Sequence, residues 1–171
     1  MTDPEFTRPE QLSTIGSAAR SVAVEADAGE RTALARRFGL VAIDALAGDF
    51  TLRREANGFA VRGRVRAVVA QACSVTGDPV RTRVDEAVEL RFVADDAAGE
   101  GDEVELSDDS IDVLTHDGQA IDVGEVAAET MMLALDPFPR SPGADAALQA
   151  AGVLGEGETG PFAALAGLLK R

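Results

Sequence analysis

A row of arginines offers the clearest binding chemistry in this chain. Arg62, Arg64 and Arg66 alternate with apolar residues, and Arg81 and Arg83 do so in a second segment of the same character. Alternate residues of a strand lie on one face, roughly 6.6 to 7 Å apart, which is near the phosphate spacing of an extended nucleic-acid strand. A guanidinium donates planar, paired hydrogen bonds that suit phosphate. These five arginines therefore form a candidate phosphate-binding surface.

An alternative interpretation of the row uses only the chain itself. Asp85 and Glu89 share the polar face of the second segment with Arg81 and Arg83. Opposite charges on neighbouring strands pair across a solvated sheet face, and such pairs need no ligand. Both interpretations stay open at the level of the sequence.

The other reactive side chains have structural interpretations that are stronger than the chemical ones. Glu125 and Glu129 are four residues apart and share a helix face, the minimum for two carboxylates to meet one metal ion or proton, but a solvated first helical turn is the simpler interpretation. Cys73 is the only cysteine, so it can form no intramolecular disulfide and no multi-cysteine zinc site. The only histidine, His116, lies in a predicted turn, so Cys73 has no identifiable base and is expected to be a packed, inert thiol.

Composition excludes several classes of function. The 171 residues carry a formal net charge of −14, which argues against coating nucleic acid through a general positive field. The charge is unevenly distributed, since residues 51–93 hold eight Arg against five acids, whereas residues 95–129 hold thirteen acids and no Lys or Arg. No phosphate-binding glycine loop, HExxH or GxSxG pattern occurs, and we expect neither an enzyme nor a cofactor or metal site.

Two helices and a hairpin are predicted from local signals. Asp27 and Glu30 have capping-box spacing, which starts a helix that runs to Phe38 and ends at Gly39. Leu40 to Ala56 is predicted as a strand, and the following Asn57-Gly58 favours a type I′ hairpin turn. A second helix runs from Asp122 to Asp136, where Asp122 and Glu125 repeat the capping-box spacing and Pro137 ends the helix.

Further strands and turns complete the expected sheet. Short strands are expected near Glu5 to Thr7 and at Ser21 to Glu25, and a longer one at Val80 to Val93. The segment from Cys73 to Pro79 is a predicted loop, and Asp117-Gly118 suggests another hairpin.

These elements indicate the α+β class, with an antiparallel twisted sheet or partly closed barrel beside two main helices. We expect one domain over residues 1–140, a flexible Gly- and Ala-rich linker over 141–160 and a short helical tail over 161–171. The chain has no apolar run of membrane-spanning length and no signal-peptide pattern, so a cytoplasmic protein is expected.

Three stretches resemble the YceD family, the large ribosomal RNA subunit accumulation proteins. The stretch LARRFGLVAIDALAGDFTLRR looks like the domain entry of alphaproteobacterial members, and VRGRVRAVVAQACSVTGDPVRTRVDEAVELRFV is similar to the central hairpin of the family. The stretch IDVGEVAAETMMLALDPFPRSPG resembles its Leu-rich helix with a Pro-containing exit, and the terminal GPFAALAGLLKR resembles its tail. The resemblance covers most of the chain from Leu34 to Arg171.

The resemblance implies a non-enzymatic role in the synthesis, processing or stability of 23S ribosomal RNA. Many members carry Cys-x-x-Cys in the central loop and further cysteines after the helix, a plausible zinc site, but here Thr76 takes the second position and residues 137–145 contain no Cys. A zinc site is therefore expected to be absent. The positions that match family motifs have no resolved role, and they are Cys73, Pro79, Glu125, Glu129, Pro161 and Phe162.

Two functional hypotheses follow. In the first, the protein is a ribosome-biogenesis factor whose five arginines contact 23S rRNA or its precursor, while the acidic remainder limits non-specific binding. In the second, it is an acidic adaptor or chaperone for a basic large-subunit ribosomal protein and makes no direct RNA contact. The sequence does not specify an oligomeric state.

Overall fold

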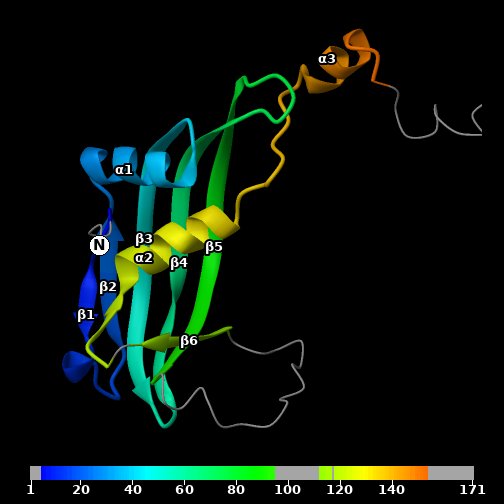
Figure 1. Cartoon of the computed structure of the whole chain (residues 1–171). Coiled ribbons are helices and arrows are strands. Elements are labelled where there is room, and N and C mark those ends of the chain that lie inside the picture. The colour runs from blue at the N-terminus through cyan, green and yellow to red at the C-terminus, as the bar shows by residue number, and fades with distance from the viewer. Residues whose placement is uncertain (1–4, 95–111, 117, 154–171) are drawn as a thin grey trace, which may run out of the picture. The chain divides into compact units, whose positions relative to one another are not determined.

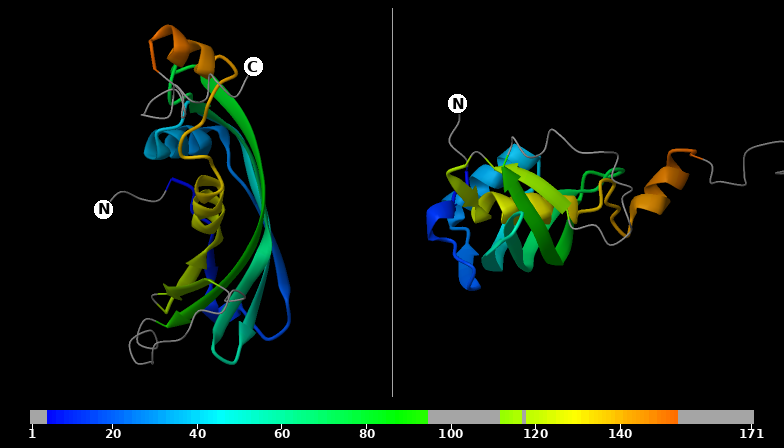
Figure 2. Two further views of the ribbon diagram at one scale, coloured as in Figure 1. Left: turned by 90° about the vertical axis from the view of Figure 1, so that its right-hand side faces the viewer. Right: turned by 90° about the horizontal axis from the view of Figure 1, so that it is seen from below.

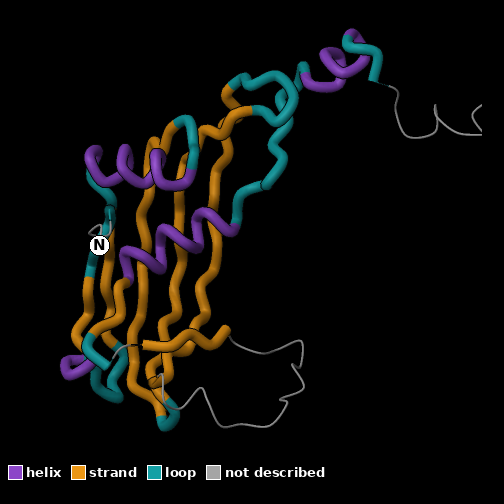
Figure 3. Tube along the Cα trace, viewed as in Figure 1, coloured by secondary structure: helices purple, strands orange, loops and turns teal. Residues whose placement is uncertain are grey.

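The computed structural model describes residues 5–94, 112–116 and 118–153 (Figures 1 and 3). These residues form two compact units: the larger holds those up to Ala70 and from Arg81 to Asp136, and the smaller holds those from Gln71 to Val80 and from Pro137 onward. The elements in chain order are β1 (Pro9–Gln11), the 3-10 helix η1 (Leu12–Thr14), β2 (Arg20–Glu25), α1 (Ala28–Phe38), β3 (Ala42–Glu55), β4 (Gly58–Ala72), β5 (Pro79–Ala94), β6 (Asp112–His116), β7 (Ala120–Asp122), α2 (Val123–Leu133) and α3 (Ala144–Ala150).

A five-stranded sheet in the order β2-β3-β4-β5-β6 dominates the fold. The β2–β3 and β3–β4 pairs are antiparallel, whereas β5 and β6 are parallel, with Leu90 opposite Asp112 and Ala94 opposite His116. A parallel neighbour needs a long connection, and residues 95–111 separate the two strands. The predicted α+β class is confirmed, with an open, mostly antiparallel sheet in place of a closed barrel.

The β3–β4 hairpin is present, but its turn differs from the predicted type I′. Glu55 pairs with Gly58, so Ala56 and Asn57 form the two-residue loop. A type I′ turn needs positive φ at both loop residues, and no non-glycine residue in the described part of the chain has a positive φ. Glycine is required at the first residue of β4, directly after the loop. Gly58 has a φ of 123° there, and a Cβ would lie 2.1 Å from the Phe92 carbonyl oxygen.

Side-chain caps begin both predicted helices. Asp27 accepts a hydrogen bond from the Glu30 N–H, and Glu30 accepts one from the Asp27 N–H, which completes the predicted capping box of α1. Gly39 ends that helix in the left-handed conformation, with a φ of 66°. Asp122 caps α2 by accepting from the N–H groups of Gly124 and Glu125. The predicted capping box is not completed, because the Glu125 carboxylate pairs with Arg37 instead.

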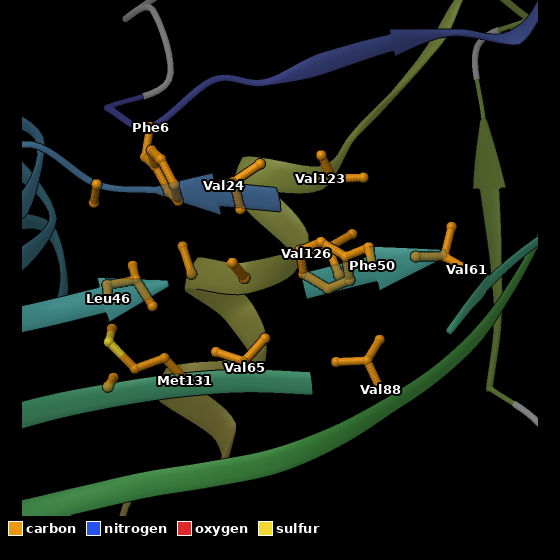
Figure 4. Close-up of a cluster of buried hydrophobic side chains, with 14 of the residues drawn as sticks. Phe6, Val24, Leu46, Phe50, Val61, Val65, Val88, Val123, Val126 and Met131 are labelled. Atoms are coloured by element: carbon orange, nitrogen blue, oxygen red, sulfur yellow. The ribbon is translucent and has the colours of Figure 1, made fainter. Parts of the chain in front are cut away.

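The core lies between the sheet and the two helices α1 and α2, both of which pack on the same face of the sheet (Figure 2). The apolar alternation of β4 and β5 faces this core, as predicted. Figure 4 shows the fully or almost fully buried side chains that fill it, among them Phe6, Leu46, Phe50, Val61, Val65, Val88, Val126 and Met131. Aliphatic residues supply most of this core because the chain has only seven Phe and no Trp or Tyr.

A two-stranded antiparallel sheet ties the N-terminal segment to the start of α2. It pairs β1 with β7, with Glu10 opposite Ile121. The short N-terminal strand was predicted at Glu5 to Thr7, so it begins four residues later than expected. The predicted hairpin at Asp117-Gly118 is wrong, because β6 joins the large sheet beside β5 while β7 pairs with β1.

Helix α3 lies within the segment predicted as a linker over residues 141–160. The predicted tail over 161–171, with Pro161 and Phe162, lies outside the described residues. Among the helices that the structure describes, none has the length and apolar character needed to cross a membrane.

Candidate functional site

The arginine face is the surface formed by Arg62, Arg64, Arg66, Arg81 and Arg83, all of which are exposed. On β4, the three arginines alternate with Val61, Gly63, Val65 and Ala67, whose side chains or positions lie toward the core. In the larger unit, α1 and α2 cover only the opposite face of the sheet, so neither of these helices covers the arginines (Figure 2). The predicted division of β4 and β5 into an apolar and an arginine-bearing face is therefore present.

Carboxylates on neighbouring strands pair with the arginines of β4. Arg64 Nη1 lies 2.7 Å from Asp85 Oδ1, and Arg62 Nε lies 2.8 Å from Glu89 Oε1. The hydrogen bond and charge of Arg64 hold the pKa of Asp85 below its usual range. These two contacts match the alternative interpretation, in which acids of the second segment neutralise the row.

Acids of β3 add to this pairing. Arg66 Nη1 lies 2.9 Å from Asp49 Oδ2, and Arg81 forms an ion pair with Asp44. Within the described part of the chain, Arg83 is the member of the arginine face for which the structure shows no ion pair. Four of the five arginines thus already hold a carboxylate.

These ion pairs are exposed, which limits their strength. The side chains of Arg64 and Asp85 are 48% and 62% exposed, and those of Arg66 and Asp49 are 56% and 60% exposed. Solvated pairs of this kind contribute about 0–1 kcal/mol each. A phosphate group can replace such a carboxylate at little cost, so the pairs hold the arginines extended on the sheet without sequestering them.

The loop around Cys73 directs several N–H groups at the thiol. Cys73 is buried, and its Sγ accepts hydrogen bonds from the N–H groups of Val75 and Thr76 at 3.4 Å and of Ser141 at 3.3 Å. Ser74 fastens the same loop, since its N–H donates to the Pro139 carbonyl at 2.8 Å. The sequence indicated a packed thiol, and the structure adds this set of donors.

This environment changes the acidity of the thiol. Hydrogen bonding by Ser141, and then by Thr76, through hydroxyl and backbone N–H groups lowers the pKa of Cys73 to about 6. A thiolate at neutral pH is a metal ligand or nucleophile in principle, but each chemistry requires partners. The described residues contain no group of three or more His, Cys, Asp or Glu side chains suited to hold a metal ion.

The two candidate carboxylates on α2 have separate surroundings. Glu125 accepts a hydrogen bond from Arg37 Nη1 at 2.9 Å and also pairs with Arg37 Nη2, which links α1 to α2. Glu129 is exposed, and its pKa is raised by partial desolvation and by the charge of Glu125. Because Arg37 occupies Glu125, the described structure favours a helix-positioning role for that carboxylate over a shared metal or proton site.

A match to a family model decides the family. The family is described as "Large ribosomal RNA subunit accumulation protein YceD", and its model matches residues 61–169. The chain belongs to the YceD family. No curated protein and no solved structure matches the chain.

The YceD match covers the arginine face, the Cys73 loop and α2. Pro79 begins β5 directly after that loop. The stretch from Leu34 to Arg54, which resembles the family, lies before the matched residues. The family model therefore covers neither β3 nor the end of α1. The family description assigns its members to the accumulation of large-subunit ribosomal RNA.

The sequence did not indicate the long-range ion pairs that hold the helices of this YceD protein in place. Arg8 forms a two-pronged ion pair with Glu30 at 2.8 and 3.0 Å, and its backbone N–H donates to Asp122 at 2.8 Å. Arg37 makes the second such link, since it joins α1 to α2 through its ion pair with Glu125. Each pair joins residues that are far apart in the chain, so local spacing carried no signal for them.

Proposed function

We propose that this YceD protein is a non-catalytic cytoplasmic ribosome-biogenesis factor that supports the synthesis, processing or stability of 23S rRNA by contacting the RNA or its precursor. The arginine face, with Arg62, Arg64, Arg66, Arg81 and Arg83, is the contact surface. The observation that carries the proposal is the placement of all five arginines on the sheet face opposite α1 and α2.

The chemistry of this face suits a backbone contact that does not depend on base sequence. Planar guanidinium groups bind phosphate in pairs of hydrogen bonds, and the row supplies several on adjacent strands. Contacts to phosphates position a protein on its nucleic acid, whereas sequence is read through the bases. The chain has no Trp or Tyr to stack on bases, so phosphate contacts are the expected main component.

The carboxylates paired with the arginine face compete with phosphate and so lower the affinity for RNA. A phosphate must displace Asp85 from Arg64 or Asp49 from Arg66 before it binds. Together with the net charge of −14, this competition keeps binding to arbitrary RNA weak at physiological salt. A weak and salt-sensitive contact suits a factor that leaves its RNA after acting on it.

The experiment that tests this proposal measures binding of the full chain to fragments of precursor 23S rRNA at several salt concentrations. Arg62, Arg64, Arg66, Arg81 and Arg83 are replaced together by Gln, and circular dichroism verifies that the variant is folded. Loss of affinity with a shallower salt dependence supports the proposal. Unchanged affinity and salt dependence in the folded variant overturn the direct contact.

A second function is favoured by the ion pairs themselves. Four arginines of the face already hold carboxylates, and the whole chain is strongly acidic, so an acidic adaptor or chaperone for a basic large-subunit ribosomal protein also fits. The discriminating experiment is a purification from cells with and without nuclease. A basic ribosomal protein that stays bound after nuclease treatment supports the adaptor, and complete loss of ribosomal material opposes it.

A further inference from the structure

A groove of about 510 Å³ lies between α1 and the start of β3. This volume lies in the range typical of small-molecule and cofactor sites. The groove belongs to the larger unit and is separate from the residues that the sequence singled out. Its lining comprises Ala28, Arg31, Thr32, Ala35, Arg36, Leu40, Val41, Ala42, Ile43 and Asp44.

The local sequence explains why the groove exists. Positions 28, 31, 32, 35 and 36 recur at helical spacing and share one face of α1. After Gly39 ends the helix, residues 40–44 run alongside that face. Ala28 and Ala35 lie on the helix face that lines the groove. Alanine is the smallest residue that favours a helix, so these two positions leave the groove open.

Several residues that line the groove are apolar. Ala35 and Ile43 are buried, and Leu40 is partly buried against the core. Val41 is 55% exposed, a large apolar side chain at the opening. These residues offer apolar contacts to a ribose or a base.

Two arginines, Arg31 and Arg36, also line the groove. Arg36 is exposed, and the structure shows it in no ion pair or hydrogen bond with any described side chain. Arg31 donates to the Ala26 carbonyl at 2.5 Å through one nitrogen, which leaves its other donors available. The one acid in the lining, Asp44, is already paired with Arg81. The groove therefore carries an excess of positive charge within a chain of net charge −14.

We infer that the α1–β3 groove binds one nucleotide unit of single-stranded RNA, with the phosphate on Arg36 and Arg31 and the ribose or base against Val41 and its neighbours. Single-stranded RNA fits because its bases are accessible, whereas those of a duplex are stacked inside the helix. An Arg guanidinium plane offers a stacking surface where aromatic residues are absent. This inference deepens the proposed function and rests on it.

One ion pair links the groove to the arginine face. Asp44 lines the groove and pairs with Arg81, which belongs to that face. A phosphate that displaces Asp44 from Arg81 would therefore change the charge at the groove as well as on the arginine face.

The test measures binding of the full chain to a fluorescent ten-nucleotide oligouridine at several salt concentrations. Arg36→Gln removes the unpaired cation, and Arg20→Gln on β2 is the matched control, since it makes the same charge change at an exposed arginine outside both sites. We expect Arg36→Gln to weaken binding about tenfold. The slope of log affinity against log salt is expected to fall by about 0.7, as for one lost phosphate contact on a single strand.

A second variant and a second ligand separate the possible outcomes of this test. Val41→Asp places a negative charge at the opening without altering a buried residue, and it is expected to weaken binding as well. Equal affinities of the Arg36→Gln and Arg20→Gln variants overturn the inference. If the variant with all five arginines of the arginine face replaced still loses binding, the proposed function survives that result. Uridine monophosphate that binds as tightly as the oligonucleotide, with the same sensitivity to Arg36→Gln, would also overturn it in favour of a free-nucleotide site.

Discussion

The Arg64 guanidinium on β4 lies 2.7 Å from the Asp85 carboxylate on β5, on the sheet face opposite α1 and α2. This contact raises the pKa of Arg64 and lowers that of Asp85, since each charge stabilises the other. A phosphate that binds Arg64 must replace this carboxylate. The ion pair is therefore a built-in competitor of the proposed RNA contact.

Removal of the competitor is predicted to strengthen RNA binding. In Asp85→Asn, Arg64 loses its partner and becomes available to phosphate, so affinity for 23S rRNA fragments should rise and its salt dependence should steepen. The unfolding free energy should fall by less than about 1 kcal/mol, because the pair is exposed. Asp145→Asn, which makes the same charge change in an exposed pair with Arg140, is the control. Equal affinities of the two variants would contradict the competition.

The β3–β4 hairpin is predicted to depend on Gly58 far more than α1 depends on Gly39. A Cβ at Gly58 would lie 2.1 Å from the Phe92 carbonyl oxygen, whereas one at Gly39 meets nothing within 4 Å. Both residues have positive φ, so Gly39→Ala should cost about 1–2 kcal/mol from backbone strain alone. Gly58→Ala adds a clash with the backbone and should cost about 3 kcal/mol or more. Urea denaturation measures both, and equal losses would argue against the close approach of Gly58 to β5.

The two helix caps are predicted to differ in importance. Asp27 accepts from the backbone N–H of Glu30, so Asp27→Ala should cost about 1 kcal/mol. Asp122 accepts from three N–H groups, those of Arg8, Gly124 and Glu125. Asp122→Ala leaves all three without this acceptor and should cost about 2 kcal/mol or more. Thermal or urea unfolding ranks the variants, and a larger loss for Asp27→Ala would show that the link to Arg8 contributes little.

The Cys73 thiol is predicted to ionise well below the usual range. With a pKa of about 6, its thiolate absorbance in the ultraviolet should rise between pH 5 and 7 and level off above, where an ordinary cysteine would still be gaining thiolate. Ser141→Ala removes the hydroxyl and should move the midpoint upward. Because the pKa in the folded state lies below the reference value of 9.0, this group adds stability as pH rises from about 6 to 9 and loses it as pH falls back. A midpoint near 8.5 in the folded wild-type chain would contradict the hydrogen-bonded thiol.

The sequence predicted the features that depend on neighbours in the chain. The capping box of Asp27 and Glu30, the end of α1 at Gly39 and the two faces of β4 all follow from spacings of two to four residues. The position of the Asn57-Gly58 hairpin followed for the same reason, although its turn type did not, because the close approach of β5 to Gly58 is a tertiary contact.

Features that join distant segments could not be predicted in this way. The parallel pairing of β6 with β5 and the pairing of β7 with β1 depend on which edges the rest of the fold leaves open. For the same reason, the sequence indicated that Asp85 and Glu89 could neutralise the arginines but not that Asp49 and Asp44 would do so from β3. The groove beside Arg36 exists only once residues 40–44 lie along α1.

Crosslinking in living cells tests the central claim most directly. The full chain is crosslinked and purified, the sample is divided, and one half is treated with nuclease before RNA and protein partners are identified together. The account predicts crosslinks between precursor 23S rRNA and the strands that carry Arg62 to Arg83, and their loss when the five arginines are replaced by Gln. Crosslinks to a basic ribosomal protein alone, unchanged by nuclease, would contradict it and leave the arginine face as an ordinary solvated surface of the sheet.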